Sequence, residues 1–372
     1  MNEYDNLNSV GEEVTSSVEQ NETNYPQTSA EQPSENVQPE NNGFVPNINK
    51  WIDPETAQEK RQIKTDARII GAAFLAMYGM IFLFNLAVII VAFILQAGSD
   101  STAAEILWEP AVLQVQQILF ASAAFTLPFI FIFKLGDLRI SDLISFSLPD
   151  RRTFFPFFLI GVAFCNFANI ASSIAESLFD KTDIDYQVTA PQNPTGIFGF
   201  ALAFISTVIV PALAEEFACR GLMLGLLRKY GDAFAIMASS LLFGLMHGNF
   251  EQMPFAFLVG LVLGFVTVKS GSILPAMAIH AFNNFISICF DYFLSGVPAY
   301  AQNIGYIVFL TVGLLLGIVA VLMFRDSDGF YKLKPSQMRS GESKKFIWFF
   351  TSVPILIYAG LCVLESLQFF VF

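Results

Sequence analysis

The chain places three formal charges inside an apolar segment, in the stretch Ala214-Glu215-Glu216-Phe217-Ala218-Cys219-Arg220-Gly221. This stretch directly follows the apolar run 198–213, which has the composition of a membrane helix. A charged side chain at the centre of a membrane helix costs roughly 2.5 to 3.5 kcal/mol on insertion scales, and such residues usually mark function. A functional site is therefore expected here.

The overall composition points to a lipid environment. Hydrophobic residues make up 54% of the chain, charged residues make up only 14%, and 41 residues are phenylalanine. This profile lies far outside that of soluble globular proteins. The net charge of −12 argues against a nucleic-acid partner, because binding to phosphates requires a basic surface.

Apolar runs recur along the whole chain. Each is long enough, or nearly so, to cross about 30 Å of hydrocarbon, which takes about 20 helical residues. The runs cover residues 69–96, 112–133, 155–179, 198–227, 233–250, 253–268, 273–294, 304–324 and 346–370. They predict an all-α fold, a polytopic membrane helix bundle with about eight to nine transmembrane helices.

The amino-terminal segment has a different composition. It is rich in Asn, Gln, Glu, Ser, Thr and Pro, and residues 1–50 hold nine acidic residues and one lysine. Such a segment cannot bury enough apolar surface to fold alone. We therefore predict a disordered, acidic, cytoplasmic tail over residues 1–60.

The basic residues of the short loops are distributed unevenly. With the amino terminus in the cytoplasm, the outward loops hold only one basic residue, Lys181, while all the other loop lysines and arginines face inward. This positive-inside bias predicts a multi-pass protein with a cytoplasmic amino terminus and an outward carboxyl terminus. In that topology His247 lies deeper than Glu215 and His280, so a helix must tilt or break near Gly244 and Gly248, or a connection must dip into the bilayer.

The charged stretch has an informative spacing. Glu216 and Arg220 are four residues apart in the favourable order for a helical ion pair, which predicts that they neutralise each other. Glu215 lies about 100° around the helix and is freer to do chemistry. Pro211 removes the hydrogen bond to the carbonyl of Thr207 and predicts a kink beside a wet cavity, because a freed carbonyl in lipid needs a partner.

The two histidines of the chain, His247 and His280, also lie in apolar segments. His280 and Asn284 share one helix face and could donate two hydrogen bonds to an oxyanion, or could simply hold helices together. Asn283 is expected on another face, in packing. Glu215 and His247 could take a proton from water, or could bind a metal together with His280.

Cysteines offer a further alternative. All four fall in apolar segments and match no zinc-site spacing, so they are expected to be buried free thiols. Cys219 lies four residues after Glu215, and a cysteine peptidase that pairs it with a histidine stays open.

These residues resemble the CAAX protease and bacteriocin-processing family, also called CPBP or Abi intramembrane proteases. That family has three ordered motifs, Glu-Glu-x-x-x-Arg, Phe-x-x-x-His and His-x-x-x-Asn. All three are complete and in order here, as Glu215, Glu216 and Arg220, then Phe243 and His247, then His280 and Asn284. The resemblance covers residues 198–290, about a quarter of the chain.

The resemblance implies a CAAX-type intramembrane endopeptidase. Glu215 and His247 would activate the attacking water, and His280 with Asn284 would stabilise the oxyanion, while the second glutamate and the arginine of the first motif would be structural. The family divides between a metalloprotease and a metal-independent glutamate mechanism. In the first, Zn²⁺ would be held by Glu215, His247 and His280, and in the second there would be no cofactor.

The resemblance also suggests an organisation of the chain. Residues 196–295 would be the catalytic core, between amino-terminal transmembrane helices at 61–195 and carboxy-terminal ones at 296–372. Membrane lipid and a membrane-anchored peptide or protein substrate would be its partners, and the composition of the tail favours a bacterial plasma membrane. The alternatives are a non-catalytic scaffold or bacteriocin immunity protein with the same fold, and a transporter with a proton relay, although no inverted repeat supports the latter.

Overall fold

A computed structural model of the chain describes residues 53–98, 104–179, 185–186, 193–294, 296–324 and 332–371. Most of the predicted amino-terminal tail lies outside these residues. The described elements are helices and one short strand pair: α1 (Pro54–Ala97), η1 (Ile106–Trp108), α3 (Pro110–Leu135), α4 (Ile140–Leu143), α5 (Arg151–Phe179), β1 (Asp185–Tyr186), α6 (Gly196–Ala203), η2 (Phe204–Ile209), α7 (Val210–Glu216), η3 (Phe217–Met223), α8 (Leu224–Leu227), η4 (Arg228–Tyr230), α9 (Asp232–Leu245), α10 (Gln252–Ser270), α11 (Leu274–Phe293), α12 (Ala299–Met323), α13 (Glu342–Phe350), α14 (Val353–Leu367) and β2 (Phe370–Val371).

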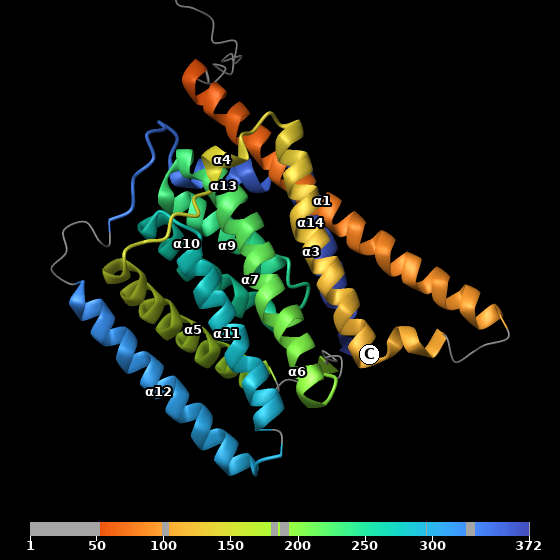
Figure 1. Ribbon diagram of the computed structural model, residues 1–372. Helices are drawn as coiled ribbons and strands as arrows, with labels where there is room; N and C mark the ends of the chain where they lie inside the picture. Colours follow the sequence, from red (N-terminus) through yellow and green to blue (C-terminus); the bar gives the residue numbers. More distant parts are fainter. Residues whose placement is uncertain are drawn as a thin grey trace, which may run out of the picture. The chain divides into compact units, whose positions relative to one another are not determined.

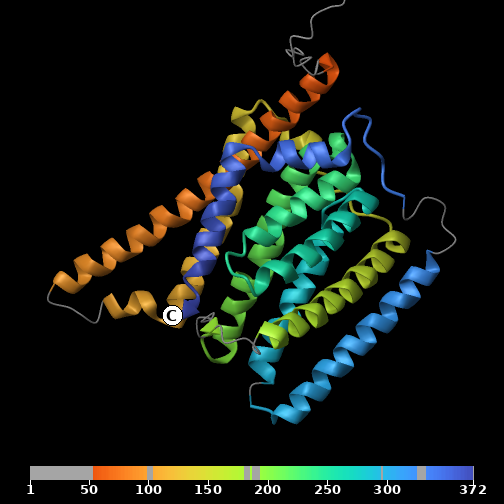
Figure 2. The same cartoon turned by 180° about the vertical axis from the view of Figure 1, so that it is seen from behind.

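The helices pack in a sequence that leaves the motif-bearing elements in the middle. Helix α12 packs against α5, α5 packs against α10 and α11, and α10 packs against α9 (Figure 1). On the other side, α3 packs against α7, and α1 packs against α3 and α14 (Figure 2). The charged stretch and His280 lie in helical elements that have helices on more than one side, and His247 lies in the turn after α9.

The predicted class, an all-α membrane helix bundle, is confirmed, with a smaller number of spans. Six described helices are long and apolar enough to cross a membrane, and the pair α13–α14, bent by 72°, makes a seventh if it counts as one. Helix α9 is only 14 residues long, and α11 carries several polar side chains in its middle and last turns, among them His280, Asn283, Asn284, Ser287 and Asp291. The apolar runs of the sequence predict eight to nine spans, because hydropathy alone does not show where a helix ends.

The charged stretch belongs to one continuous helical segment, Gly196–Tyr230. Two wide π-helical turns interrupt it, Phe204–Ile209 before the glutamates and Phe217–Met223 after them. Pro211 lies at the start of α7, so the first wide turn accommodates the missing hydrogen bond donor of the proline. Such turns often occur at functional sites.

Helix α9 ends early, at Leu245, where the chain turns back toward α10. Gly248 has a φ of +65°, a left-handed conformation that favours glycine. Gly244 lies so close to α10 that an added Cβ would be 2.9 Å from the carbonyl oxygen of Met253. The predicted break near Gly244 and Gly248 is therefore present, and it determines where His247 lies.

Ion pairs join distant segments at the end of the bundle that contains the start of α1. Lys229 Nζ lies 2.6 Å from Asp66 Oδ2, and Tyr230 donates a hydrogen bond of 2.5 Å to the same oxygen. Arg339 Nε lies 2.6 Å from Glu55 Oε2. The motif-bearing helix is thus connected to α1 at the end where the sequence analysis places the cytoplasm.

Candidate active site

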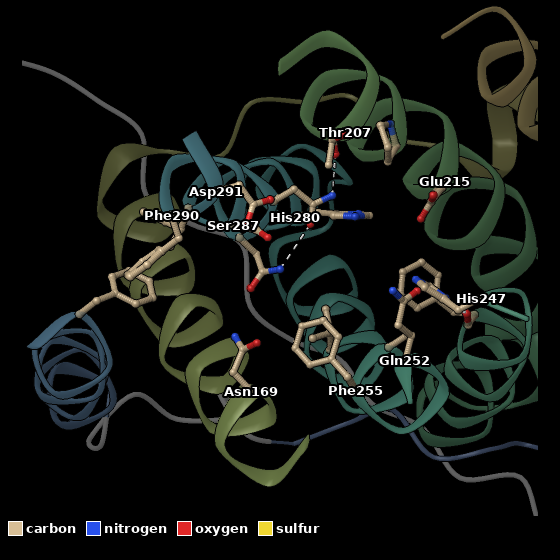
Figure 3. A pocket seen from close by; sticks show the side chains of 18 of the residues that line it. Asn169, Thr207, Glu215, His247, Gln252, Phe255, His280, Ser287, Phe290 and Asp291 are labelled. Carbon is tan, nitrogen blue, oxygen red and sulfur yellow. Dashed lines mark hydrogen bonds between the residues drawn. The ribbon is translucent and has the colours of Figure 1, made fainter. Parts of the chain in front are cut away.

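The predicted site residues meet at one cavity of about 650 Å³. Glu215, His247, His280 and Asn284 all line it, although they come from α7, the end of α9 and α11 (Figure 3). Helices α3, α5, α10 and α12 complete the wall, so the cavity is enclosed by helices from most of the chain.

Asn284 satisfies the carbonyl that Pro211 leaves free. Its Nδ2 donates a hydrogen bond of 2.9 Å to the carbonyl oxygen of Thr207, four residues before the proline (Figure 3). The expected unpaired carbonyl therefore exists and has a partner inside the cavity. An amide nitrogen carries two hydrogens, so Asn284 keeps one N–H for another acceptor.

Asn283 also lines the cavity, contrary to the expectation that it would face a different side in packing. Its Nδ2 donates to Asn284 Oδ1 over 3.3 Å. Because an amide oxygen only accepts, this contact orients Asn284 with its NH₂ group toward Thr207. Asn283 is thus a positioning neighbour that helical spacing alone did not assign to the site.

Glu216 is the buried centre of a second set of contacts. Its Oε1 accepts a hydrogen bond of 2.9 Å from Arg220, as the spacing predicted, and also lies 2.9 Å from His280 Nδ1. Glu216 is fully buried and Arg220 is 1% exposed. The first and third motifs therefore meet through this carboxylate.

Phe243, the aromatic residue of the second motif, connects the same groups. The guanidinium of Arg220 lies over its ring at 3.9 Å, a cation–π contact. Its ring also contacts the imidazoles of His247 and His280 edge to face, with centroids 5.1 Å and 6.1 Å apart. The phenylalanine thus fixes the spacing between the two histidines.

The hydrogen bonds at Nδ1 define which nitrogen of each histidine is free. His247 Nδ1 lies 2.9 Å from the carbonyl oxygen of Phe243, which can only accept, so Nδ1 carries the proton and Nε2 is basic in the neutral ring. His280 Nδ1 faces a carboxylate and is likewise the donor. The last carbonyls of a helix lack backbone partners, so the carbonyl of Phe243 can accept from a histidine side chain four residues later. This contact explains the spacing of the Phe-x-x-x-His motif.

The loop that carries His247 is held by a helix near the carboxyl terminus. Ser366, on α14, is buried and donates a hydrogen bond of 3.0 Å to the carbonyl oxygen of Gly248. An added Cβ on Gly248 would lie 2.8 Å from Glu365 Oε2 of the same helix. Asn249 Nδ2 donates to the carbonyl oxygen of His247 over 3.1 Å. No feature of the sequence linked α14 to the site.

We expect Gly248→Ala to lower activity while Gly271→Ala leaves it near the wild-type value. Both glycines have a left-handed φ, +65° and +69°, so each alanine costs about 1 to 2 kcal/mol of stability. Only Gly248 adjoins His247, whereas an added Cβ at Gly271 meets open space. Thermal unfolding should therefore shift in both variants, whereas turnover of a peptide substrate should fall only in Gly248→Ala. Equal activity loss in both would contradict a positioning role for this loop.

The cavity does not present a formed metal centre. Within the described residues, no group of three His, Cys, Asp or Glu side chains is arranged to hold a metal ion. Of the three candidate zinc ligands, Glu215, His247 and His280, the last has Nδ1 committed to Glu216. Zinc binding stays a prediction of the resemblance, and no step proposed below passes through a metal.

Cys219 does not share the cavity with Glu215. It is fully buried, its Sγ lies 4.0 Å from Met246 Sδ, and it is not among the described residues that line the cavity. The wide turn Phe217–Met223 begins between the two residues and changes the angular spacing assumed for a regular helix. Like Cys165 and Cys362, Cys219 is a buried free thiol, whereas Cys289 is partly exposed.

Several other polar side chains of the cavity were not predicted. They are Gln117, Asn169, Gln252, Ser287 and Asp291. A signal did exist on α11, because His280, Asn284, Ser287 and Asp291 follow one another at intervals of four, three and four residues, which places them on one helix face. The lone amides on α3, α5 and α10 have no comparable pattern.

Comparison with protein families bears out the resemblance for the central part of the chain. Residues 197–286 match the family described as type II CAAX prenyl endopeptidase Rce1-like. The matched segment contains every residue of the three motifs and runs from α6 into α11. No curated protein and no solved structure matches the chain. Residues 197–286, which are similar to this protease family, therefore lie within a multi-pass bundle of apolar helices.

Proposed function

We propose that this protein is an intramembrane endopeptidase that hydrolyses a peptide bond of a membrane-associated protein or peptide. One observation carries the proposal: a carboxylate, two imidazoles and a carboxamide from three separate elements line one cavity within the family-matched segment. Buried polar groups in a membrane protein are costly and usually serve function. Their types are those that water activation and oxyanion stabilisation require.

In this proposal Glu215 and His247 activate the water. The water proton passes to the Glu215 carboxylate or to Nε2 of His247, which is the basic nitrogen because Nδ1 donates to Phe243. The water oxygen then bonds to the carbonyl carbon of the peptide. The same proton is later given to the leaving nitrogen as the C–N bond breaks, so the products are a carboxylate and an amine.

The oxyanion would be held by His280 and Asn284. Asn284 has one N–H left after its bond to Thr207. Since Nδ1 of His280 is engaged with Glu216, the ring donates from Nε2 only when it carries both protons. The hydrogen bond from Nδ1 to the Glu216 carboxylate would also orient the His280 ring in the cavity.

We further propose a multi-pass protein of a bacterial plasma membrane with a cytoplasmic amino terminus. The inward distribution of loop lysines and arginines supports the orientation. Labelling of single cysteines introduced near residues 139 and 298 in intact cells tests it. Only the second is expected to react with a membrane-impermeant reagent.

Cleavage of a membrane-anchored peptide library by the purified protein in detergent tests the proposal. We expect hydrolysis at defined bonds, retained in Cys219→Ser and lost in His247→Ala. Parallel samples with a chelator and with added Zn²⁺ choose between the metalloprotease and glutamate mechanisms, because only the first loses turnover on chelation. No cleavage by a folded wild-type protein would favour the scaffold or immunity function, in which the fold is used without chemistry.

A further inference from the structure

Asp291 is a charged residue of the cavity that the proposed reaction does not use. It lies in the last turn of α11, on the helix face that carries His280, Asn284 and Ser287 (Figure 3). It lines the same cavity as Glu215. Together, Glu215 and Asp291 are the carboxylates of this cavity.

The Asp291 side chain is exposed and lies at the carboxyl-terminal end of α11. The carboxyl-terminal end of a helix carries the negative end of the macrodipole, which repels an anion. The last turn of α11 holds no basic residue, and no Lys or Arg is among the described residues that line the cavity. Within the described residues Asp291 has neither an ion pair nor a hydrogen bond, so its exposed carboxylate is free to bind a cation.

The distance to the reaction site follows from helix geometry. Asp291 lies seven residues after Asn284, which is two turns, or about 10.5 Å along the axis at 1.5 Å per residue. An extended peptide advances about 3.3 Å per residue. A substrate that lies along α11 with its scissile carbonyl at Asn284 would therefore bring a side chain about three residues away to Asp291.

We propose that Asp291 is a substrate subsite that binds a positive charge, an ammonium or guanidinium group, about three residues from the scissile bond. This inference rests on the proposed endopeptidase function. No Lys or Arg is among the described residues that line the cavity, so a basic substrate residue near Asp291 meets a carboxylate without a competing Lys or Arg. A basic residue would also cancel the charge that the helix end disfavours.

A lysine scan through one cleaved peptide tests the subsite. The peptide is acetylated at its amino terminus, and a single lysine is moved through each position around the scissile bond, with norleucine as the uncharged reference. Wild type is expected to show a kcat/KM about fivefold higher with lysine at one position near three residues away. In Asp291→Asn the ratio of kcat/KM between the lysine and norleucine peptides should fall to about one, which separates loss of the charge contact from a general loss of activity.

Three further arms make the test decisive. Glu109→Gln removes an exposed carboxylate at the start of α3, outside the cavity, and should keep the lysine preference. Asp291→Lys should instead favour glutamate at the preferred position. A further peptide carries its free amino terminus at the preferred distance from the scissile bond. Its rate of cleavage shows whether Asp291 binds a terminal ammonium as well as a side-chain ammonium. An unchanged lysine preference in Asp291→Asn would overturn the subsite, whereas no cleavage by wild type would overturn the proposed function itself.

Discussion

Glu215→Gln is expected to lower kcat for peptide hydrolysis by on the order of 10³-fold, within the range that loss of a general base causes. The amide has the shape of the carboxylate but cannot accept the proton of the attacking water. Glu215 makes no ion pair with the described residues, because Arg220 and His280 both contact Glu216 instead. The substitution should therefore leave folding intact while it removes the chemistry.

The measurement is turnover of the library-selected peptide together with thermal unfolding of both proteins in the same detergent. We expect equal unfolding temperatures and residual activity near background in the variant. Glu109→Gln, which changes an exposed carboxylate before α3 and outside the cavity lining, serves as the matched control and should retain most activity. Activity within about twofold of wild type in Glu215→Gln would refute the assigned base.

Arg220→Met should destabilise the protein by about 3 to 5 kcal/mol, because it leaves the buried Glu216 carboxylate without its charged partner. The substitution also removes the cation over the Phe243 ring and the hydrogen bond of Arg220 Nη2 to the carbonyl oxygen of Gly260, 3.4 Å away. We expect activity to fall as well, since Glu216 also positions His280.

A matched pair elsewhere in the chain isolates the effect of burial. Arg228 and Asp232 have the same four-residue spacing, but the Arg228 side chain is 35% exposed. Arg228→Met should cost less than about 1 kcal/mol. The double variant Glu216→Gln/Arg220→Met should be more stable than Arg220→Met alone, because it removes the uncompensated charge. Equal losses of stability for Arg220→Met and Arg228→Met would show that the buried network contributes little.

The sequence predicted the fold class and the four residues that meet at the cavity. These residues were predictable because charged and amide side chains in an apolar helix usually serve function. The three family motifs also contain all four of them. The need for a partner at the Thr207 carbonyl was also predicted, since Pro211 cannot donate a hydrogen bond, but Asn284 as that partner was not. The pairing of Glu216 with Arg220 followed from a local spacing.

Contacts between distant segments were not predictable in the same way. The bond between His280 and Glu216 joins residues 64 positions apart, and neither spacing nor hydropathy identifies such a pair. Asn283 lines the cavity although it is one residue from Asn284, because neighbouring side chains on a helix can both border a wide space. The contact of Ser366 with the His247 loop depends on how α14 packs.

The number of spans shows the limit of hydropathy. The apolar run 233–250 predicts a transmembrane helix, yet α9 ends at Leu245 after 14 residues, before the left-handed turn at Gly248. Positive φ values, wide turns and a bend of 72° between α13 and α14 all depend on tertiary packing. The early end of α9 is also what places His247 at the cavity that Glu215 lines.

Hydrolysis of the selected membrane-anchored peptide in H₂¹⁸O tests the central claim most directly. The wild-type protein should place one ¹⁸O atom in the new carboxyl terminus during a single turnover, with no mass added to the protein, because the nucleophile is water activated by Glu215 and His247. A covalent acyl-protein intermediate, or product carboxylate without ¹⁸O, would contradict the claim.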